Sequence, residues 1–574
     1  MFKQGVRRES FGVALIIRRI IMTTTYDSKM FRETFESQFT YLNGFMRNVR
    51  RFGWRTAVID PASKKQWNYT EFNADCNRLA NAMKADGVKK SDIVFAQLFN
   101  SPQFLFGYIG SQKIGAIMNP VNFNLSPGET SEIMAHNKPK VYIYDSEIAE
   151  TAVKALELCS HKPDVVIAVN NSKKEFSVPE GHVLYEDYVK NQSELDPPVD
   201  FEPHIYDEVV RLQTSGTTGT PKGVPLNNIN EVLSAHDVIM HFPLNPTDIT
   251  MNMTPWFHRG GLHSGGPTPT LYIGGTLVIM RTFNPKVTLE YVERFGISFI
   301  TGVPSILTLL ASRQEKKPKN ISSLKGIITM GSPLEKEACI RFQNVLTPNI
   351  FNGYGTTESF WNTFLRPFDL PEMSGTAGRS CTDDEVRVVK VYEDRKAEPD
   401  ELVAQDNTEE GEVIIMCPGK STYCYAGNEK ATEEKFYKGW MYTGDIATWD
   451  KKQFVTIAGR KDDMIISKGE NIYPARIEEV INSNTKVEEC IVTGVPDSTR
   501  GESLAAYVIP ADDSLTVSEL LDFCSKSPNL SKYQIPRYFR FVKELPTTAT
   551  GKKQHYVIKK QAKEDLKNGL LLRK

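Results

Sequence analysis

The sequence lacks both a long apolar run and closely paired cysteines. Its eight cysteines lie scattered over 574 residues without a CxxC motif, which argues against a zinc site or a disulfide framework and favours a reducing compartment. The net charge is −1, so no overall field favours nucleic acid or an anionic membrane as a partner. We therefore expect a cytoplasmic protein that binds no nucleic acid and has no integral membrane association. The sequence does not distinguish a monomer from a homodimer.

The first 22 residues are basic and partly amphipathic. Their apolar run at residues 11–17 is about seven residues long, far short of the ~20 that a membrane span needs. The residues after Met22 offer no convincing signal-peptidase site. A mitochondrial presequence is one interpretation, but we prefer an upstream start codon with translation beginning at Met22 or Met30. We expect residues 1–30 to be an N-terminal extension, either untranslated or disordered.

The length predicts several domains, because a single core stops growing near ~250–300 residues. Helix-like segments, one of them with Thr70 as its N-cap, alternate with apolar runs such as residues 93–99 and 141–144. This alternation predicts a large N-terminal α/β domain of layered lobes with parallel strands. Short strands and turns between about Val386 and Trp449 indicate a small β-rich subdomain. The remainder alternates again and favours a small, mobile α+β C-terminal domain.

A glycine-rich run, Thr214-Ser-Gly-Thr-Thr-Gly-Thr-Pro-Lys-Gly223, follows a short predicted strand at residues 208–213. Glycines let backbone N–H groups approach a ligand closely, and the lysine adds a mobile positive charge. Both properties fit a polyphosphate. The run is not a Walker A loop, because Lys222 is followed by glycine and not by Ser or Thr. The alternative interpretation is a flexible Gly/Thr surface loop.

Five further segments place polar groups next to turn-forming glycines. They are residues 256–261, 352–358, 442–445, 459–463 together with 467–474, and 546–552. In order and spacing, the six motifs resemble the adenylate-forming superfamily of acyl-CoA synthetases, luciferases and peptide-synthetase adenylation domains. The similarity extends from about Phe31 to the C-terminus and is greatest to the medium-chain and the aryl or alicyclic acyl-CoA ligases. It implies an ATP- and acyl-binding domain at 31–458, a hinge at 459–463 and a mobile domain at 464–574.

The resemblance implies a nucleotide site built from several of these segments. Its expected members are Thr214, Ser215, Gly216, Thr217, Thr218, Gly219, Lys222, Gly331, Ser332, Pro333, Asn352, Gly353, Tyr354, Gly355, Thr356, Thr357, Asp445 and Arg460. Tyr354 would lie flat against adenine, Asp445 would accept from the ribose hydroxyls, and Arg460 would reach the ribose or α-phosphate. Glu358, a hard oxygen ligand, would hold Mg²⁺. Read alone, Glu358 would be interpreted as a carboxylate at a helix N-terminus, and Asp445 could equally be part of an Asx-type turn.

Three residues receive catalytic roles from the same resemblance. Lys552 would neutralise the charge that develops when a carboxylate attacks the α-phosphorus. Spacing alone does not separate Lys552 from Lys553, but the family pattern of Gly followed by Lys selects Lys552. His258 would close the entrance between the acyl pocket and the thiol tunnel. The C-terminal domain would rotate about Asp462, and that rotation brings a tunnel-lining set to the pantetheine. This set is Lys468, Gly469 and Glu470.

The implied activity is that of an AMP-forming acyl-CoA ligase, which uses ATP, Mg²⁺ and coenzyme A. The closest rival is an acyl-AMP ligase that passes its acyl group to a carrier protein. A luciferase-type oxygenase fits poorly, because it would usually end in a peroxisomal Ser-Lys-Leu signal. A catalytically silent regulator would be expected to lack Lys552, Glu358 or Asp445, and all three are present.

The acyl substrate is a small-molecule carboxylic acid. By family position its pocket draws on residues 256–266, 301–304, 330–332 and 352–361, which combine several glycines with Trp256, Phe257, Phe360 and Trp361. Aromatic walls favour an aromatic, alicyclic or medium-chain acid over acetate. Arg259 and His263 could contact a second polar group, but we expect them to be exposed.

Overall fold

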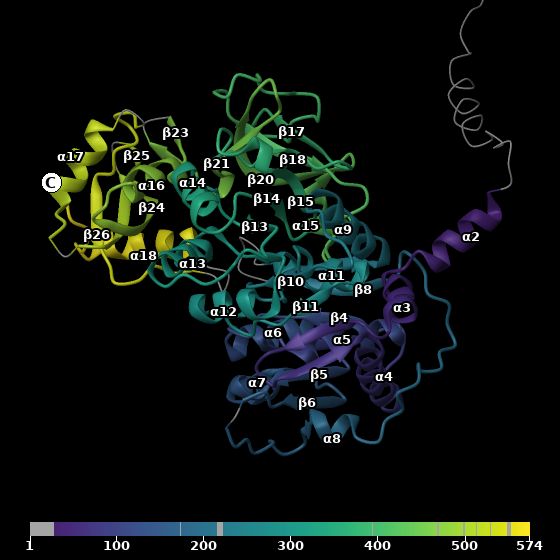
Figure 1. Ribbon diagram of the computed structural model, residues 1–574. Helices are drawn as coiled ribbons and strands as arrows, with labels where there is room; N and C mark the ends of the chain where they lie inside the picture. Colours follow the sequence, from purple (N-terminus) through teal and green to yellow (C-terminus); the bar gives the residue numbers. More distant parts are fainter. Residues whose placement is uncertain are drawn as a thin grey trace, which may run out of the picture.

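The computed structural model describes residues 28–172, 174–214, 222–392, 394–467, 470–497, 500–512, 514–527, 530–547 and 553–573. Four sheets, with seven, nine, five and five strands, organise these residues. Figure 1 shows the C-terminal part, in yellow, standing to one side of the larger N-terminal body. A mixed α/β architecture with a large N-terminal and a smaller C-terminal domain confirms the predicted fold class.

The first lobe is built on the seven-stranded sheet. Its order is β7 (Val183–Leu184), β6 (Val165–Val169), β5 (Val141–Asp145), β3 (Ile93–Gln97), β4 (Ile117–Pro120), β8 (Glu208–Thr214) and β9 (Lys222–Asn227). All neighbours pair in parallel except the β8–β9 hairpin. β3 and β5 are buried along their whole length, as expected for strands covered on both faces.

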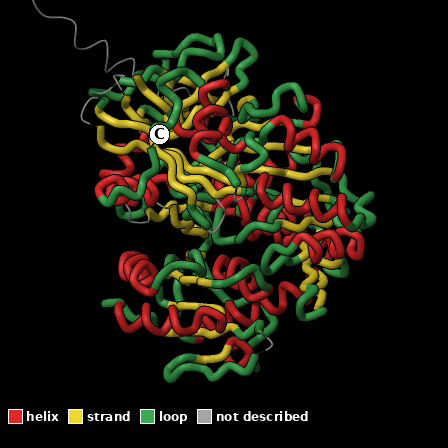
Figure 2. The backbone as a smooth tube through the Cα atoms, turned by 90° about the vertical axis from the view of Figure 1, so that its left-hand side faces the viewer, coloured by secondary structure: helices red, strands yellow, loops and turns green. Residues whose placement is uncertain are grey.

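Helices cover both faces of this sheet (Figure 2). They are α4 (Tyr69–Ala85), α5 (Pro102–Lys113), α6 (Pro127–Asn137), η1 (Ser146–Ile148), α7 (Ala149–Leu158) and α8 (Tyr185–Val189). The expected cap at Thr70 is wrong. Asn68 caps α4 instead, and its side chain exchanges a reciprocal capping box with Glu71. Asn68 also ends β2 (Lys65–Asn68), so the chain turns directly from strand into helix.

The second lobe contains the nine-stranded sheet. Its order is β16 (Arg379–Ser380), β15 (Phe360–Leu365), β14 (Ile350–Thr356), β13 (Gly326–Met330), β12 (Phe299–Thr301), β10 (Ile249–Asn252), β11 (Thr276–Val278), β1 (Thr56–Asp60) and β2 (Lys65–Asn68). The helices of this part are α2 (Lys29–Gln38), α3 (Tyr41–Phe52), α9 (Asn228–His241), α10 (Arg259–His263), α11 (Pro267–Ile273), α12 (Pro285–Phe295), α13 (Pro304–Lys316), α14 (Lys336–Val345) and η2 (Pro367–Asp369). Side chains of α12, α13 and α14 share one apolar core with β12 and β13. Phe242, which directly follows α9, forms a second core with aromatic residues of β12, β14 and β15.

Two smaller sheets complete the molecule. The β-rich subdomain contains β17 (Glu385–Val389), β18 (Gly411–Met416), α15 (Glu429–Lys435), β19 (Phe436–Tyr437), β20 (Trp440–Trp449) and β21 (Val455–Arg460). The C-terminal unit contains η3 (Lys461–Asp463), β22 (Ile465–Ser467), β23 (Glu470–Ile472), α16 (Pro474–Asn482), β24 (Val487–Asp497), β25 (Gly501–Pro510), α17 (Val517–Lys526), β26 (Tyr538–Phe541) and α18 (His555–Lys567). Its core is separate from those of the N-terminal body.

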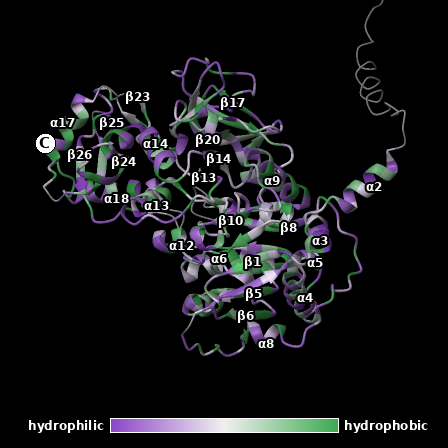
Figure 3. Ribbon diagram, in the orientation of Figure 1, coloured by the Kyte–Doolittle hydropathy of each residue, from purple (hydrophilic) through white to green (hydrophobic). Residues whose placement is uncertain are grey.

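Hydropathy follows this layering, with apolar residues gathered on the inner strands and polar residues on the outer loops (Figure 3). Among the residues that the structure describes, no helix is both long and apolar enough to cross a bilayer.

Candidate functional site

Three predicted nucleotide-binding residues meet where β14, β20 and β21 lie together. The Tyr354 hydroxyl donates to Asp445 Oδ2 at 2.6 Å, and Arg460 NH1 donates to Asp445 Oδ1 at 2.7 Å. Asp445 and Arg460 are register partners of the β20–β21 pair. Each carboxylate oxygen has a second lone pair, so Asp445 can still accept from a ligand hydroxyl. The structure therefore brings together side chains that are 91 and 106 residues apart in the chain.

Burial and neighbouring charges shift the pKa values of Tyr354 and Arg460. Burial, followed by the charge of Asp445, raises the pKa of Tyr354 far above its ordinary value. Burial alone would lower the pKa of Arg460, but the carboxylate of Asp445 outweighs it and raises the pKa. Arg460 is thus a fixed cation and Tyr354 a fixed donor at neutral pH. Such a pair suits a hydroxyl-rich ligand that carries phosphate.

Glu358 lies in the tight turn between β14 and β15, so its alternative interpretation as a helix N-terminal carboxylate is wrong. It is 6% exposed, and the Tyr425 hydroxyl donates to its Oε1 at 2.5 Å. Burial would raise the pKa of Glu358, but the charge of Lys435 and the bond from Tyr425 outweigh burial and lower it. A carboxylate kept ionised in a dry site is a suitable oxygen ligand for Mg²⁺.

The glycine-rich run connects β8 to β9. Thr214 and Lys222, its described ends, face each other as register partners. The Lys222 ammonium lies 5.3 Å from the ring centroid of Tyr425, the same residue that contacts Glu358. The side chain of Tyr425 therefore contacts both Lys222 and Glu358, the predicted metal ligand. The other predicted residues of this run lie outside the described residues, namely Ser215, Gly216, Thr217, Thr218 and Gly219.

The neighbouring strands β13 and β14 bring the next predicted residues to one edge of the sheet. Met330 pairs with Gly353 and Thr329 with Asn352, in parallel register. Gly331 follows β13 with φ +86°, a conformation that favours glycine. Ser332 and Pro333 come next and are exposed, while Gly355 and Thr356 continue β14 and Thr357 enters the Glu358 turn. Ligands of α/β sheets bind at such carboxyl ends of strands.

Arg259 and His263 are not exposed, contrary to expectation. His258 is the N-cap of α10, and the short helix packs against α9. Arg259 NH2 donates to Ser234 Oγ at 3.1 Å, and His263 Nε2 lies 2.7 Å from Glu231 Oε1. Both side chains have internal partners because α9 presents polar groups to α10. They are therefore part of the packing around the acyl segment and are not surface groups.

The predicted hinge residue Asp462 and the described lysine of the adjacent pair, Lys553, lie in different surroundings. Asp462 lies in η3 with its side chain 57% exposed, 3.9 Å from Arg460 NH2. Lys553 Nζ donates to the Cys490 carbonyl at 2.7 Å and to Glu478 at 3.3 Å. Because Lys553 is bound inside its own domain, Lys552 is the candidate for catalysis. Lys552, Lys468 and Gly469 lie outside the described residues, and Glu470 begins β23.

Sequence reasoning missed Tyr425 and Lys435. Lys435 Nζ donates to the Thr443 carbonyl at 2.9 Å, two residues before Asp445. Tyr425 connects Glu358 to Lys222, as described above. No motif marked either residue, since each is an ordinary side chain that only the fold brings to the site.

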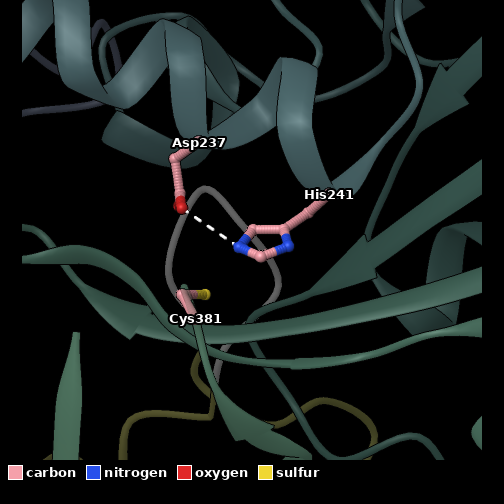
Figure 4. Close-up of side chains that lie close together, drawn as sticks. All are labelled: Asp237, His241 and Cys381. Carbon is pink, nitrogen blue, oxygen red and sulfur yellow. Dashed lines mark ion pairs between the residues drawn. The ribbon is translucent and has the colours of Figure 1, made fainter. Parts of the chain in front are cut away.

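A second polar cluster lies behind β15. Asp237, His241 and Cys381 place potential ligand atoms within 4.8 Å of one another (Figure 4). Two cations contact this cluster: Lys420 Nζ lies 2.9 Å from Asp237 Oδ2, and Arg366 NH2 lies 2.8 Å from His241 Nδ1. The cluster is thus part of a buried ion network.

Comparison with known proteins agrees with this geometry. Residues 45–421 match the family model described as AMP-binding enzyme, and residues 476–552 match the AMP-binding enzyme C-terminal domain. A feruloyl-CoA synthase of an Amycolatopsis species is 30% identical over 486 residues, covering 84% of this chain and 91% of that protein. The indoleacetate–CoA ligase of Aromatoleum aromaticum is 28% identical, covering 87% of this chain and 93% of that protein.

Among solved structures, the fold is similar to that of the anthranilate CoA ligase AuaEII in complex with anthranoyl-AMP. That likeness has a TM-score of 0.81 at 22% identity and covers 92% of this chain and 98% of that one. The resemblance read from the six motifs is confirmed. The chain belongs to the family of AMP-binding enzymes.

Proposed function

We propose that this enzyme is an AMP-forming acyl-CoA ligase for an aromatic, alicyclic or medium-chain carboxylic acid. It would form an acyl-adenylate and pyrophosphate from the acid and ATP, and the CoA thiol would then displace AMP. The observation that carries the proposal is the Tyr354–Asp445–Arg460 triad. It provides an aromatic ring, a carboxylate and a cation where β14, the strand that leads into the Glu358 turn, lies beside β20 and β21.

Each group has a task in the first half-reaction. Tyr354 supports the base, Asp445 accepts from the ribose, and Arg460 with Lys222 offsets phosphate charge. Glu358 would hold Mg²⁺, which when bound neutralises charge on the phosphate oxygens. Attack of a carboxylate on phosphorus brings two anions together, so catalysis rests on positioning and electrostatics. Lys552 would supply the remaining positive charge.

The second half-reaction needs a different arrangement of the C-terminal unit. Asp462 is exposed on a short 3₁₀ turn between two separate cores. A residue with few packing contacts can absorb a backbone rotation, as hinges do. Rotation there would withdraw Lys552 and bring Lys468, Gly469 and Glu470 to the thiol. A carrier-protein thiol in place of CoA is the alternative.

The acyl segments favour a flat or bulky acid. Phe360 and Trp361 are each 3% exposed and stack with ring centroids 4.9 Å apart. The printed names of relatives, feruloyl-CoA synthase and indoleacetate–CoA ligase, refer to aromatic acids. This supports an aromatic acid as the first to test.

Pyrophosphate release with and without CoA tests the proposal. Benzoate, cyclohexane carboxylate, octanoate and a long-chain acid should be compared, with Asp445→Ala as the inactive control. We expect turnover that requires both an acid of the first three classes and CoA. Strong turnover without any CoA requirement would contradict the ligase assignment.

A further inference from the structure

The indole of Trp361 carries a buried donor without an acceptor. Trp361 is the second residue of β15 and is 3% exposed. Its Nε1 has no hydrogen-bond partner among the residues that the structure describes. Buried polar groups in native proteins nearly always have partners, and an exception at a binding site calls for an explanation.

The position of this donor is fixed by Gly353. A Cβ placed on Gly353 would lie 2.9 Å from Trp361 Nε1, so the N–H edge of the indole lies against β14 immediately before Tyr354. Gly353 is in register with Met330, whose sulfur lies 2.9 Å from where a Cβ on Gly260 would be. Because register partners point to the same face of a sheet, the N–H edge of Trp361, Met330 and Gly260 lie on one face. All three belong to segments expected to line the acyl pocket.

The indole is also held firmly. Its ring stacks on Phe360 at an interplanar angle of 13° and lies 4.6 Å from the Phe364 ring centroid. The backbone carbonyl of Trp361 accepts from Lys420 Nζ at 2.5 Å. Lys420 in turn is bound by Asp237 at 2.9 Å and Asp384 at 2.8 Å. The ion network behind β15 therefore anchors the residue that carries the free donor.

Phe360 adds a second constraint. Its φ is +62°, a left-handed conformation that is rare for a bulky residue. The guanidinium of Arg259 lies 5.6 Å from the Phe360 ring centroid. A strained residue persists where its surroundings determine its conformation, and such residues cluster at ligand sites. The Phe360–Trp361 stack is thus a preorganised wall that presents a fixed N–H.

We propose that Trp361 Nε1 donates a hydrogen bond to an acceptor atom on the acyl substrate. The preferred acid would then carry an ether, hydroxyl or carbonyl oxygen, or a ring nitrogen, on an aromatic framework. This inference rests on the proposed function and adds a chemical rule for the substrate. A site built to hydrogen-bond a polar group rejects the analogue that lacks it far better than an apolar pocket rejects a changed methylene.

Matched acids test the rule. 4-Methoxycinnamate and 4-ethylcinnamate have similar shapes, but only the first has an acceptor, and the corresponding 3-substituted pair samples a second position. The readout is kcat/KM from pyrophosphate release for wild type and Trp361→Phe. We expect wild type to prefer the methoxy acid in one of the pairs by about tenfold, the usual effect of one net hydrogen bond. In Trp361→Phe that ratio should fall towards one.

Trp449→Phe is the matched control, because Trp449 Nε1 donates to the Val403 carbonyl at 3.2 Å in the β-rich subdomain. Its methoxy-to-ethyl ratio should equal that of wild type. A second measurement uses the wild-type protein alone and does not depend on the folding of a variant. The indole N–H proton resonance of Trp361 should shift downfield with the methoxy acid and much less with the ethyl acid.

The possible outcomes distinguish a failure of the hydrogen-bond rule from a failure of the proposed ligase function. Turnover of these acids with equal ratios in wild type and Trp361→Phe, or no difference in the indole resonance, would overturn the hydrogen-bond rule and leave the ligase assignment intact. If no acid in the wider panel releases pyrophosphate, the proposed function fails first.

Discussion

At the scale of single residues, the site depends on side chains whose charge is set by their neighbours. Asp445 accepts from both Tyr354 and Arg460, and Glu358 stays ionised through Lys435 and Tyr425. The six motifs predicted Asp445, Tyr354, Arg460 and Glu358. They could not reveal Tyr425, because its role depends on a contact across 67 residues of chain.

Replacing Asp445 by alanine should weaken ATP binding by about tenfold or more. The change removes a charged hydrogen-bond acceptor and leaves Arg460 with only the Thr443 carbonyl at 3.1 Å and the more distant Asp462. A hydrogen bond to a charged group is worth about 1.5–3 kcal/mol. Tyr354→Phe retains the ring and loses only the hydroxyl, so its effect should be a few-fold. Calorimetric titration with a non-hydrolysable ATP analogue measures both. Equal losses in the two variants would contradict the central place of Asp445.

The adjacent lysines should behave differently. Lys552→Ala should abolish adenylation and leave transfer of preformed acyl-AMP to CoA largely intact. Lys553→Ala should instead destabilise the protein by about 1–3 kcal/mol, because it leaves buried Glu478 and the Cys490 carbonyl short of a donor. Half-reaction rates and denaturant unfolding distinguish the two. Loss of both half-reactions in Lys552→Ala would argue against a rotating domain.

At the scale of elements, periodicity and apolar runs predicted several strands well. The apolar runs at residues 93–99 and 141–144 are strands, although the first strand ends at Gln97 and the second extends to Asp145. The predicted start of a helix was wrong where the preceding strand determines it. Asn68 ends one strand and also caps the next helix. The exposure of Arg259 and His263 was likewise wrong, because only the fold places α9 beside α10.

A buried pair joins α16 to the start of α18 and should make the C-terminal unit sensitive to pH. His555 Nε2 lies 2.7 Å from Glu478 Oε1. Burial would lower the pKa of His555, but Glu478 and Asp463 outweigh burial and the charge of Lys553, and they raise it above 6.5. Burial would raise the pKa of Glu478, but the same contact and Lys553 lower it below 4.5.

The directions of these two pKa shifts define a pH range in which both groups stabilise the fold. The His555 contribution is complete below about pH 6.5 and is lost as the pH rises through its folded value. The Glu478 contribution is present above about pH 4.5 and is lost as the pH falls through its folded value. The C-terminal unit should therefore be most stable between about pH 4.5 and pH 6.5. The measurement is the thermal unfolding transition of this unit as a function of pH. His555→Gln should remove the alkaline decline; an unchanged decline would mean that another group titrates.

At the scale of the whole molecule, two bodies with separate cores meet at a short polar turn. We expect Asp462→Pro to retain adenylation and slow thioester formation at least tenfold. Asp462 lies in a 3₁₀ turn, whose usual φ of about −50 to −70° includes that of proline, and proline resists any other φ. Single-turnover measurement of acyl-AMP and of acyl-CoA separates the steps. Equal slowing of both would show that the rotation is centred elsewhere.

In the proposed acyl pocket, position 360 would link protein stability to substrate range. The left-handed backbone of Phe360 costs about 1–2 kcal/mol, and glycine would remove that cost. Glycine would also remove a buried ring whose loss typically costs about 3–5 kcal/mol, so the strained phenylalanine is the more stable choice while its stack with Trp361 exists. A Phe360→Gly variant should therefore be less stable and, under the proposed function, should accept a wider range of acids than wild type.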